Sequence, residues 1–333
     1  MRKTICILMI LSLLISCICG ASAESRSYTL TDAAGRTVTL EDAPKRVVSG
    51  YYISSSLMIA LHAEELICGI EAKADTRPIY ALAAPELLTL PDVGSVKSFS
   101  LEACLAADPD LVILPLRLKS VAAELEGMHI PVLLVDPEDI SSLEEMIRLL
   151  GAALDREAEA DALLSYNRQL SEELTAKLQN ARRPDVYLAG NSDYLRTAGS
   201  GMYQNEMILL AGGSNAAAAL GGSSWADISY EQLLAWDPEV IILAPEAAYE
   251  AEDLLTDPEL SSLQAVKNGR VFAMPDGIEA WDSPVPSTLM GSLWMASVLH
   301  PELISPEEWQ NTVTDFYLRF YRTDVHDLLQ ADF

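Results

Sequence analysis

The stretch SLEACLAADPDLVIL at residues 100–114 decides the fold, because it recurs as SYEQLLAWDPEVIIL at residues 229–243. The copies align without a gap, and Ser, Glu, Leu, Ala, Asp, Pro, Ile and Leu recur at the same positions. Each copy predicts a helix that begins at the serine, an Asp-Pro turn, and then a continuous apolar run. Such runs are typical of parallel strands buried on both faces. The repeat therefore predicts two similar β/α halves.

The sequence around both copies alternates between predicted strands and predicted helices. In the first half we expect strands at residues 46–49, 66–70, 111–114 and 132–135, and helices at residues 54–64, 100–107 and 118–128. In the second half we expect strands at residues 186–189, 240–243 and 271–274, and helices at residues 203–210 and 229–235. The predicted fold class is α/β, with two Rossmann-like β/α lobes.

The alternation stops between residues 141 and 180. One helix is expected at residues 141–154, and a longer amphipathic helix at residues 157–179. At about 1.5 Å per residue, the second helix is roughly 30 Å long and can join the lobes. The expected domains are a signal at 1–23, an N-terminal lobe at 24–140, a connecting helical segment at 141–180, and a C-terminal lobe with terminal helices at 181–333.

Residues 1–23 have the features of an export signal. Arg2 and Lys3 form a short basic region, and residues 4–16 form an apolar region too short to span a bilayer. The sequence LISC at residues 14–17 resembles a lipobox and predicts lipidation at Cys17, whereas ASA at residues 21–23 predicts ordinary cleavage. Both routes give an exported protein, either a cell-surface lipoprotein or a periplasmic or secreted one.

The composition excludes several classes of function. The 333 residues include 22 Lys and Arg against 49 Asp and Glu, a net charge of −27. Nucleic-acid binding needs clustered basic residues, and an acidic surface is repelled by anionic lipids. We therefore expect no nucleic-acid partner, and contact with a membrane only through a lipid anchor.

Enzyme and metal-site motifs are absent from the sequence. No nucleophile elbow, P-loop or dinucleotide fingerprint occurs, and the four histidines are scattered without ligand spacing. We therefore expect neither an enzyme nor a bare metal site. Cys68 and Cys104 lie in apolar runs and are interpreted as small buried residues, although a single disulfide between them stays open.

Glu102 and Glu231 occupy the same position in the two copies of the repeat. A glutamate in a first helical turn suits the helix dipole, which explains the pair without any function. Alternatively, the two side chains are exposed carboxylates, one on each lobe, that face a basic partner. The sequence leaves both interpretations open.

The two-lobed plan, the long connecting helix and the repeated S-x-E-x-x-L-A-x-D-P unit resemble the helical-backbone (class III) substrate-binding proteins of ABC importers for iron-siderophore, haem and cobalamin. The resemblance covers nearly the whole chain after the signal, including RVVS at residues 46–49 and LAGGSN at residues 210–215. It implies a receptor, expected here as a monomer, that delivers a metal chelate to a membrane permease. In that family, glutamates at the positions of Glu102 and Glu231 form salt bridges with permease arginines.

A ligand in this architecture is expected between the lobes, at loops that follow the strands. Aromatic and basic residues of these loops could bind a chelate through flat apolar faces and forked hydrogen bonds. The candidates are Tyr51, Tyr52, Arg77, Arg117, Tyr194, Arg196, Trp225, Trp281 and Asp282. The expected ligand is a ferric siderophore or a related iron complex, with no resident cofactor. Cobalamin, haem and molybdate remain alternatives, as does an exported enzyme with an active site in the cleft.

Overall fold

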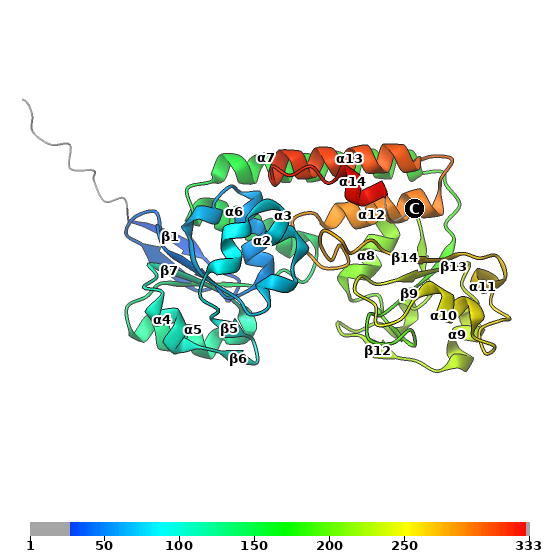
Figure 1. The fold of residues 1–333 in the computed structure, drawn as a ribbon, viewed down its shortest axis with the longest axis horizontal. Helices are drawn as coiled ribbons and strands as arrows, with labels where there is room; N and C mark the ends of the chain where they lie inside the picture. Colours follow the sequence, from blue (N-terminus) through cyan, green and yellow to red (C-terminus); the bar gives the residue numbers. More distant parts are fainter. Residues whose placement is uncertain (1–26, 331–333) are drawn as a thin grey trace, which may run out of the picture.

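The computed structural model describes residues 27–330, so the export signal and Cys17 lie outside the described residues. Two lobes lie side by side on the same side of one long helix, Glu157–Leu178, with a gap between them (Figure 1). Each lobe contains a four-stranded sheet, and all pairings within the two sheets are parallel. The α/β class predicted from the sequence is confirmed.

The two sheets are built in the same way. In spatial order, the N-terminal sheet consists of β4 (Ile67–Ile70), β3 (Val47–Ser49), β7 (Leu111–Pro115) and β8 (Val132–Val135). The C-terminal sheet consists of β11 (Ser214–Asn215), β9 (Asp185–Ala189), β13 (Val240–Leu243) and β14 (Val271–Ala273). The short pairs are β1 (Tyr28–Thr31) with β2 (Thr37–Leu40), β5 (Gly94–Ser95) with β6 (Ser98–Phe99), and β10 (Arg196–Thr197) with β12 (Ala226–Asp227).

The repeated apolar runs are the central strands β7 and β13, and both are buried on two faces. Leu111 and Ile113 belong to one hydrophobic cluster, whereas Val112 and Leu114 belong to another. The side chains of β13 alternate in the same way between two clusters. Because neighbouring strand residues point to opposite faces, a continuous apolar run is the sequence signature of such a strand.

Helices cover the two sheets. In the N-terminal lobe they are α2 (Tyr52–Ala60), α3 (Pro78–Ala83), α4 (Leu101–Ala106) and α5 (Lys119–Gly127). In the C-terminal lobe they are α8 (Tyr203–Leu210), α9 (Tyr230–Trp236), α10 (Ala251–Thr256), α11 (Gln264–Lys267) and α12 (Thr288–Leu299). No helix in the described part of the chain is long and apolar enough to cross a membrane.

The connection between the lobes is α6 (Ile140–Ala153) followed by the 22-residue helix α7 (Glu157–Leu178). Leu163, Leu170 and Leu174 lie on its buried face, as the amphipathic pattern predicts. Two further helices end the described chain, α13 (Pro306–Phe320) and α14 (His326–Gln330), and α13 lies alongside α7 (Figure 1).

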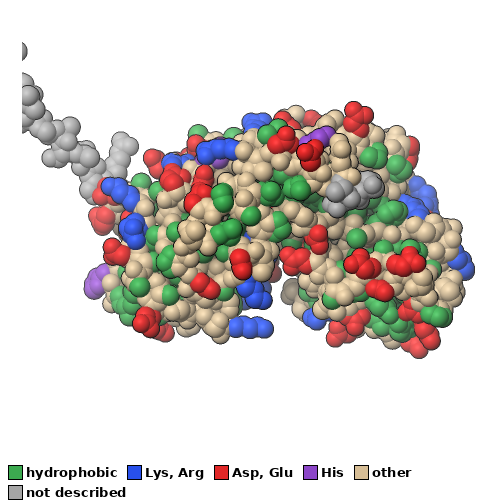
Figure 2. All heavy atoms as spheres, viewed as in Figure 1, with side chains coloured by type: hydrophobic (Ala, Val, Ile, Leu, Met, Phe, Trp, Pro, Cys, Tyr) green, Lys and Arg blue, Asp and Glu red, His purple; other side chains and the backbone are tan. Residues whose placement is uncertain are grey.

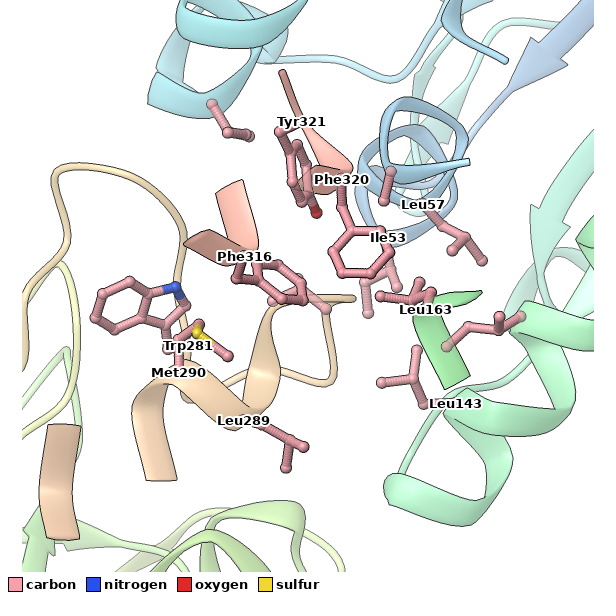
Figure 3. Close-up of a cluster of buried hydrophobic side chains, with 14 of the residues drawn as sticks. Ile53, Leu57, Leu143, Leu163, Trp281, Leu289, Met290, Phe316, Phe320 and Tyr321 are labelled. Carbon is pink, nitrogen blue, oxygen red and sulfur yellow. The ribbon is translucent and has the colours of Figure 1, made fainter. Parts of the chain in front are cut away.

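The terminal helices bridge both lobes, although the sequence placed them in the C-terminal lobe. Arg322 forms a salt bridge of 3.2 Å with Glu64, and the Tyr321 hydroxyl hydrogen-bonds Ser56 at 2.9 Å. Phe316 and Phe320 of α13 lie near Ile53 of α2, in a cluster that both lobes share (Figure 3). The two lobes are therefore joined by a common core as well as by α7.

Candidate functional site

A cleft between the lobes has a volume of about 600 Å³ and is open to solvent. The N-terminal lobe contributes Tyr51, Tyr52, Arg117, Pro137 and Glu138 to its lining. The C-terminal lobe contributes Arg196 and the segments 201–204, 223–225 and 283–284. Figure 2 shows the hollow between the lobes, with basic side chains beside it and acidic side chains spread over both lobes.

The N-terminal wall of the cleft is formed by residues that follow three parallel strands. Tyr51 and Tyr52 follow β3 after one glycine, and their rings meet edge to face with centroids 5.2 Å apart. Burial is the main cause that raises the pKa of Tyr51 above its ordinary value. Arg117 follows β7, and Glu138 lies just beyond β8. The wall is thus aromatic at its centre and charged at its rim.

Arg117 and Glu138 form a salt bridge of 3.2 Å, and their side chains are 70% and 57% exposed. An exposed pair of this kind adds little stability, because water screens both charges and two long side chains must be ordered. Arg117 is therefore available to exchange Glu138 for an anionic ligand at low energetic cost.

The C-terminal wall is built from glycine-rich loops and the start of α8. A Cβ at Gly199 would lie 2.1 Å from the carbonyl oxygen of Gly221, so only glycine lets these two loops lie against each other. Arg196 and Trp225 lie beside them, near the paired strands β10 and β12. Among residues 27–330, Arg196 forms one loose ion pair, with its Nε 3.8 Å from Asp227.

Two helix N-termini face the cleft, one from each lobe. Tyr51 is the N-cap of α2 and Met202 is the N-cap of α8, and neither side chain caps its helix. Uncapped first-turn N–H groups and the helix dipole both attract negative charge. Together with Arg117 and Arg196, they make the cleft suited to anionic oxygens within a protein that is acidic overall.

Arg77 does not line the main cleft, contrary to the sequence prediction. Its guanidinium carbon lies 4.4 Å from the ring centroid of Tyr52. It lines a much smaller cavity of about 20 Å³, which also involves Glu246 and Asp276 of the other lobe. Because Tyr52 lines both spaces, Arg77 supports the cleft wall from behind.

Trp281 was expected in the cleft, but it is fully buried in the core. Its indole meets Trp309 at 6.5 Å, and its Nε1 donates a 2.9 Å hydrogen bond to the Tyr317 hydroxyl. The proline-rich loop that follows it turns the indole inward, and only Ser283 and Pro284 reach the cleft. The prediction failed because burying a large aromatic side chain stabilises the fold more than exposing it.

Asp282 also lies behind the cleft surface and is 9% exposed. Burial, and to a lesser extent the nearby charge of Glu246, raises the pKa of Asp282 to about 7. The residue therefore does not line the cleft as predicted, although it lies directly before a loop that does.

The sequence predicted that Tyr194 lines the cleft, but the residue lies away from it. Its hydroxyl is 2.6 Å from that of Tyr230 and donates to Asp257 at 3.0 Å, and its ring meets Tyr249. These partners come from elements that pack on the far side of the C-terminal sheet. A loop tyrosine carries no local signal for which of two faces it joins.

The comparisons with known proteins agree with this geometry. The family model described as periplasmic binding protein matches residues 47–277. The chain belongs to the periplasmic binding protein family. The resemblance to substrate-binding proteins of ABC importers is thereby confirmed, and the two lobes with their cleft are the fold of that family.

Three relatives illustrate the similarity. The molybdate-binding protein MolA of Haemophilus influenzae is 28% identical over 94% of this chain and 96% of its own length, and its molybdate-bound structure superposes with a TM-score of 0.79. A periplasmic solute-binding protein of Veillonella parvula gives a TM-score of 0.82 at 26% identity, covering 92% of this chain and 96% of that one. The Fe(3+)-citrate-binding protein YfmC of Bacillus subtilis is 24% identical over 76% of this chain and 80% of its own.

The two glutamates of the repeat are exposed at the start of matching helices. Glu102 lies in the first turn of α4 and Glu231 in the first turn of α9, and Ser100 and Ser229 cap these helices. The Ser229 hydroxyl holds the pKa of Glu231 below its ordinary value. Figure 1 shows α4 and α9 at the ends of the two lobes away from α7. The helices that carry the two glutamates thus lie on the same side of the molecule.

Sequence reasoning missed several residues of the cleft. Glu138 follows β8, so the strand-end rule that found Arg117 would have found it too. Gln204 lies in the polar first turn of α8 and has no local signal for a place in the cleft, so only the tertiary structure reveals its position. Within the described residues no group of three His, Cys, Asp or Glu side chains could hold a metal ion, and Cys68 and Cys104 are free thiols.

Proposed function

We propose that this protein is the solute receptor of an ABC importer and captures an anionic metal chelate, most simply a ferric siderophore, in the cleft. The supporting observation is that the cleft is large enough for a chelate and is lined by both aromatic and basic side chains. The cleft has a volume of about 600 Å³, which lies within the ~300–1,000 Å³ typical of small-molecule pockets. Tyr51 and Trp225 offer flat rings to the apolar parts of a chelate, and Arg117 and Arg196 offer forked donors to its oxygens.

A bare oxyanion such as molybdate is the second candidate. It is supported by the similarity to MolA over nearly the full chain and by the uncapped first turns of α2 and α8. The aromatic walls and the size of the cleft favour the larger chelate, because a tetraoxo anion would leave most of this space filled with water.

The receptor is proposed to act as an exported monomer that delivers its ligand to a permease. Glu102 and Glu231 would contact basic residues of the permease, one from each lobe, since both are exposed and their helices, α4 and α9, lie on the same side of the molecule. Attachment to the membrane would be through a lipid at Cys17, or absent if the signal is cleaved after Ala23.

Thermal unfolding with a ligand panel tests this proposal. A ligand that binds only the folded state at a hundred times its Kd stabilises it by about 2.7 kcal/mol, which raises Tm by several degrees. We expect this rise with a ferric siderophore and a smaller rise with haem, cobalamin or molybdate. The Arg117→Ala/Arg196→Ala variant should lose most of it. The largest rise with molybdate would support the second candidate, and no rise with any compound would disprove the ligand assignment.

A further inference from the structure

Arg77 carries an unpaired positive charge on the N-terminal side of the boundary between the lobes. It is half-buried at the start of α3, and its guanidinium carbon lies 4.4 Å from the ring centroid of Tyr52. Its Nε is shielded from water without a hydrogen-bond partner, and Arg77 forms no ion pair with an acid of residues 27–330. Because a guanidinium stays protonated, this position keeps a charge whose donors are not fully used.

Two acids of the C-terminal lobe lie beside the same boundary. Glu246 follows β13 and has a φ of +57°, a left-handed conformation that costs a residue with a side chain more than it costs glycine. Asp276 holds it there, because its Oδ2 accepts a 3.2 Å hydrogen bond from the Glu246 backbone N–H. Neither acid forms an ion pair within the described part of the chain. Two unpaired carboxylates are thus held next to each other.

One small cavity brings the three charges together. It crosses the lobe boundary, since Arg77 and Tyr52 line it from one lobe and Glu246 and Asp276 from the other. Its volume of about 20 Å³ holds on the order of one water molecule, so the facing walls are close. Burial chiefly raises the pKa of Tyr52, while the charge of Arg77 opposes this rise and that of Glu246 adds to it. Both charges therefore lie near the same hydroxyl.

We propose that Arg77 forms an ion pair with the carboxylates of Glu246 and Asp276 when a ligand draws the lobes together. This pair, here called the lobe latch, strengthens binding although Arg77 does not touch the ligand. The inference rests on the proposed function, since a ligand must close the cleft. Tyr52 connects the two spaces, because it lines the cleft and also carries Arg77. A contact made only in the closed form favours that form and hence the bound ligand.

The buried Glu71 offers a different partner for Arg77 within the N-terminal lobe. Burial raises the pKa of Glu71, and the charge of Arg77 counteracts this rise. The carboxylate nevertheless accepts its hydrogen bonds from Ser55 at 2.6 Å and Tyr80 at 2.7 Å, and it forms no ion pair with Arg77. A role of Arg77 through Glu71 or Tyr52 alone would not depend on the acids of the other lobe, and a double-mutant cycle separates the two cases.

The cycle combines Arg77→Gln with Glu246→Gln/Asp276→Asn, and calorimetry measures binding of the ferric complex of a tris-catecholamide. Each arm should weaken binding about fivefold, because each removes the same ion pair. The combined variant should bind no more weakly than the weaker arm. In the empty protein the changes in Tm should simply add, since the latch is open. Losses of affinity that multiply, or Tm changes that do not add, would overturn the inference.

A second measurement needs no ligand. Nitroxide labels at Ala123→Cys and Ala235→Cys, exposed positions of α5 and α9, report the distance between the lobes by pulsed electron resonance. The half-buried native thiol is removed by Cys68→Ala. Arg77→Glu should lengthen this distance in the empty protein, because three acids then repel one another around one small cavity. An unchanged distance would show that these charges do not act between the lobes.

The matched control is Arg319→Gln, which removes a guanidinium that also stacks on a tyrosine ring, 5.6 Å from the centroid of Tyr166. It should leave affinity unchanged, because Arg319 lies on α13 away from the cleft. A loss equal to that of Arg77→Gln would contradict the latch. If the ferric complex does not bind the wild type, the ligand assignment fails, and the label distances still decide whether Arg77 acts across the boundary.

Discussion

Asp282 is a carboxylic acid held in the interior at the edge of the ligand cleft. Only the following two residues, Ser283 and Pro284, reach the cleft surface. Its pKa of about 7 in the folded protein lies far above the ordinary 3.8. The buried Glu71 and Glu279 also have pKa values raised by burial, so all three acids affect stability in the same direction.

Between about pH 4 and pH 7, folded Asp282 holds a proton that the unfolded chain has released. The free energy of unfolding should therefore fall as pH rises through this range. Asp282→Asn should flatten this dependence and be about 2 kcal/mol more stable than the wild type at pH 8. Urea unfolding at pH 5 and pH 8 measures the difference. Asp161→Asn, at an exposed position of α7, is the control, and an unchanged pH slope in Asp282→Asn would contradict the prediction.

At the level of helices, the two copies of the repeat differ from the two helices that face the cleft. α4 and α9 begin with serine caps, whereas α2 and α8 begin without a side-chain cap. A capping side chain would compete with a ligand for the same N–H groups. The uncapped ends therefore give up some stability of the empty protein and keep donors free for binding.

Met202→Asp tests whether α8 gives up stability to keep its N–H donors free, because the new side chain would cap the helix. The carboxylate should bond the first-turn N–H groups and stabilise the empty protein by about 0.5–1 kcal/mol. It should also weaken binding of a ferric siderophore at least about tenfold, because it occupies the donors and repels the anion. Urea unfolding and calorimetry measure the two effects.

Ser305→Ala, which removes the cap of α13, is the complementary control. It should lower stability by about 1 kcal/mol and leave affinity unchanged, because α13 begins far from the cleft. If Met202→Asp binds as tightly as the wild type, the start of α8 does not contact the ligand.

At the level of the whole molecule, the lobes are tied together at one end and free at the other. The helices α7 and α13 and the shared core lie at the tied end. The helices α4 and α9, which carry Glu102 and Glu231, lie at the opposite end (Figure 1). A stiff connection keeps the spacing of the two carboxylates nearly constant, so only small closing motions are expected. A permease could therefore bind both lobes at once, through two contacts held at a nearly fixed spacing.

The variant Glu102→Arg/Glu231→Arg should abolish ligand uptake while leaving ligand affinity within about twofold of the wild type, since both residues lie outside the cleft. Uptake in cells that carry the cognate permease, together with calorimetry of the purified variant, measures both properties. The matched control, Glu172→Arg/Glu173→Arg, makes the same charge change on α7. Normal uptake by the first variant would show that these glutamates do not dock the permease.

The sequence by itself determined the local elements and their repetition. Serine caps, Asp-Pro turns and apolar runs fixed β7, β13 and the helices before them, because each signal depends on neighbours in the chain. The same signals predicted Tyr51, Arg117 and Glu102 correctly as residues at strand ends or first helical turns. The long helix α7 was also predicted closely, since its apolar face repeats over six turns.

Only the tertiary structure decided which loop side chains reach the cleft. Trp225 lines it and Trp281 fills the core, although both are aromatic residues in polar loops. Their fates depend on partners distant in the sequence, such as Tyr317, which binds the indole of Trp281. The burial of Gln204 in the cleft wall is likewise visible only when every neighbour is in place. Element formation follows short-range periodicity, whereas burial and unpaired groups follow from long-range packing that no local pattern encodes.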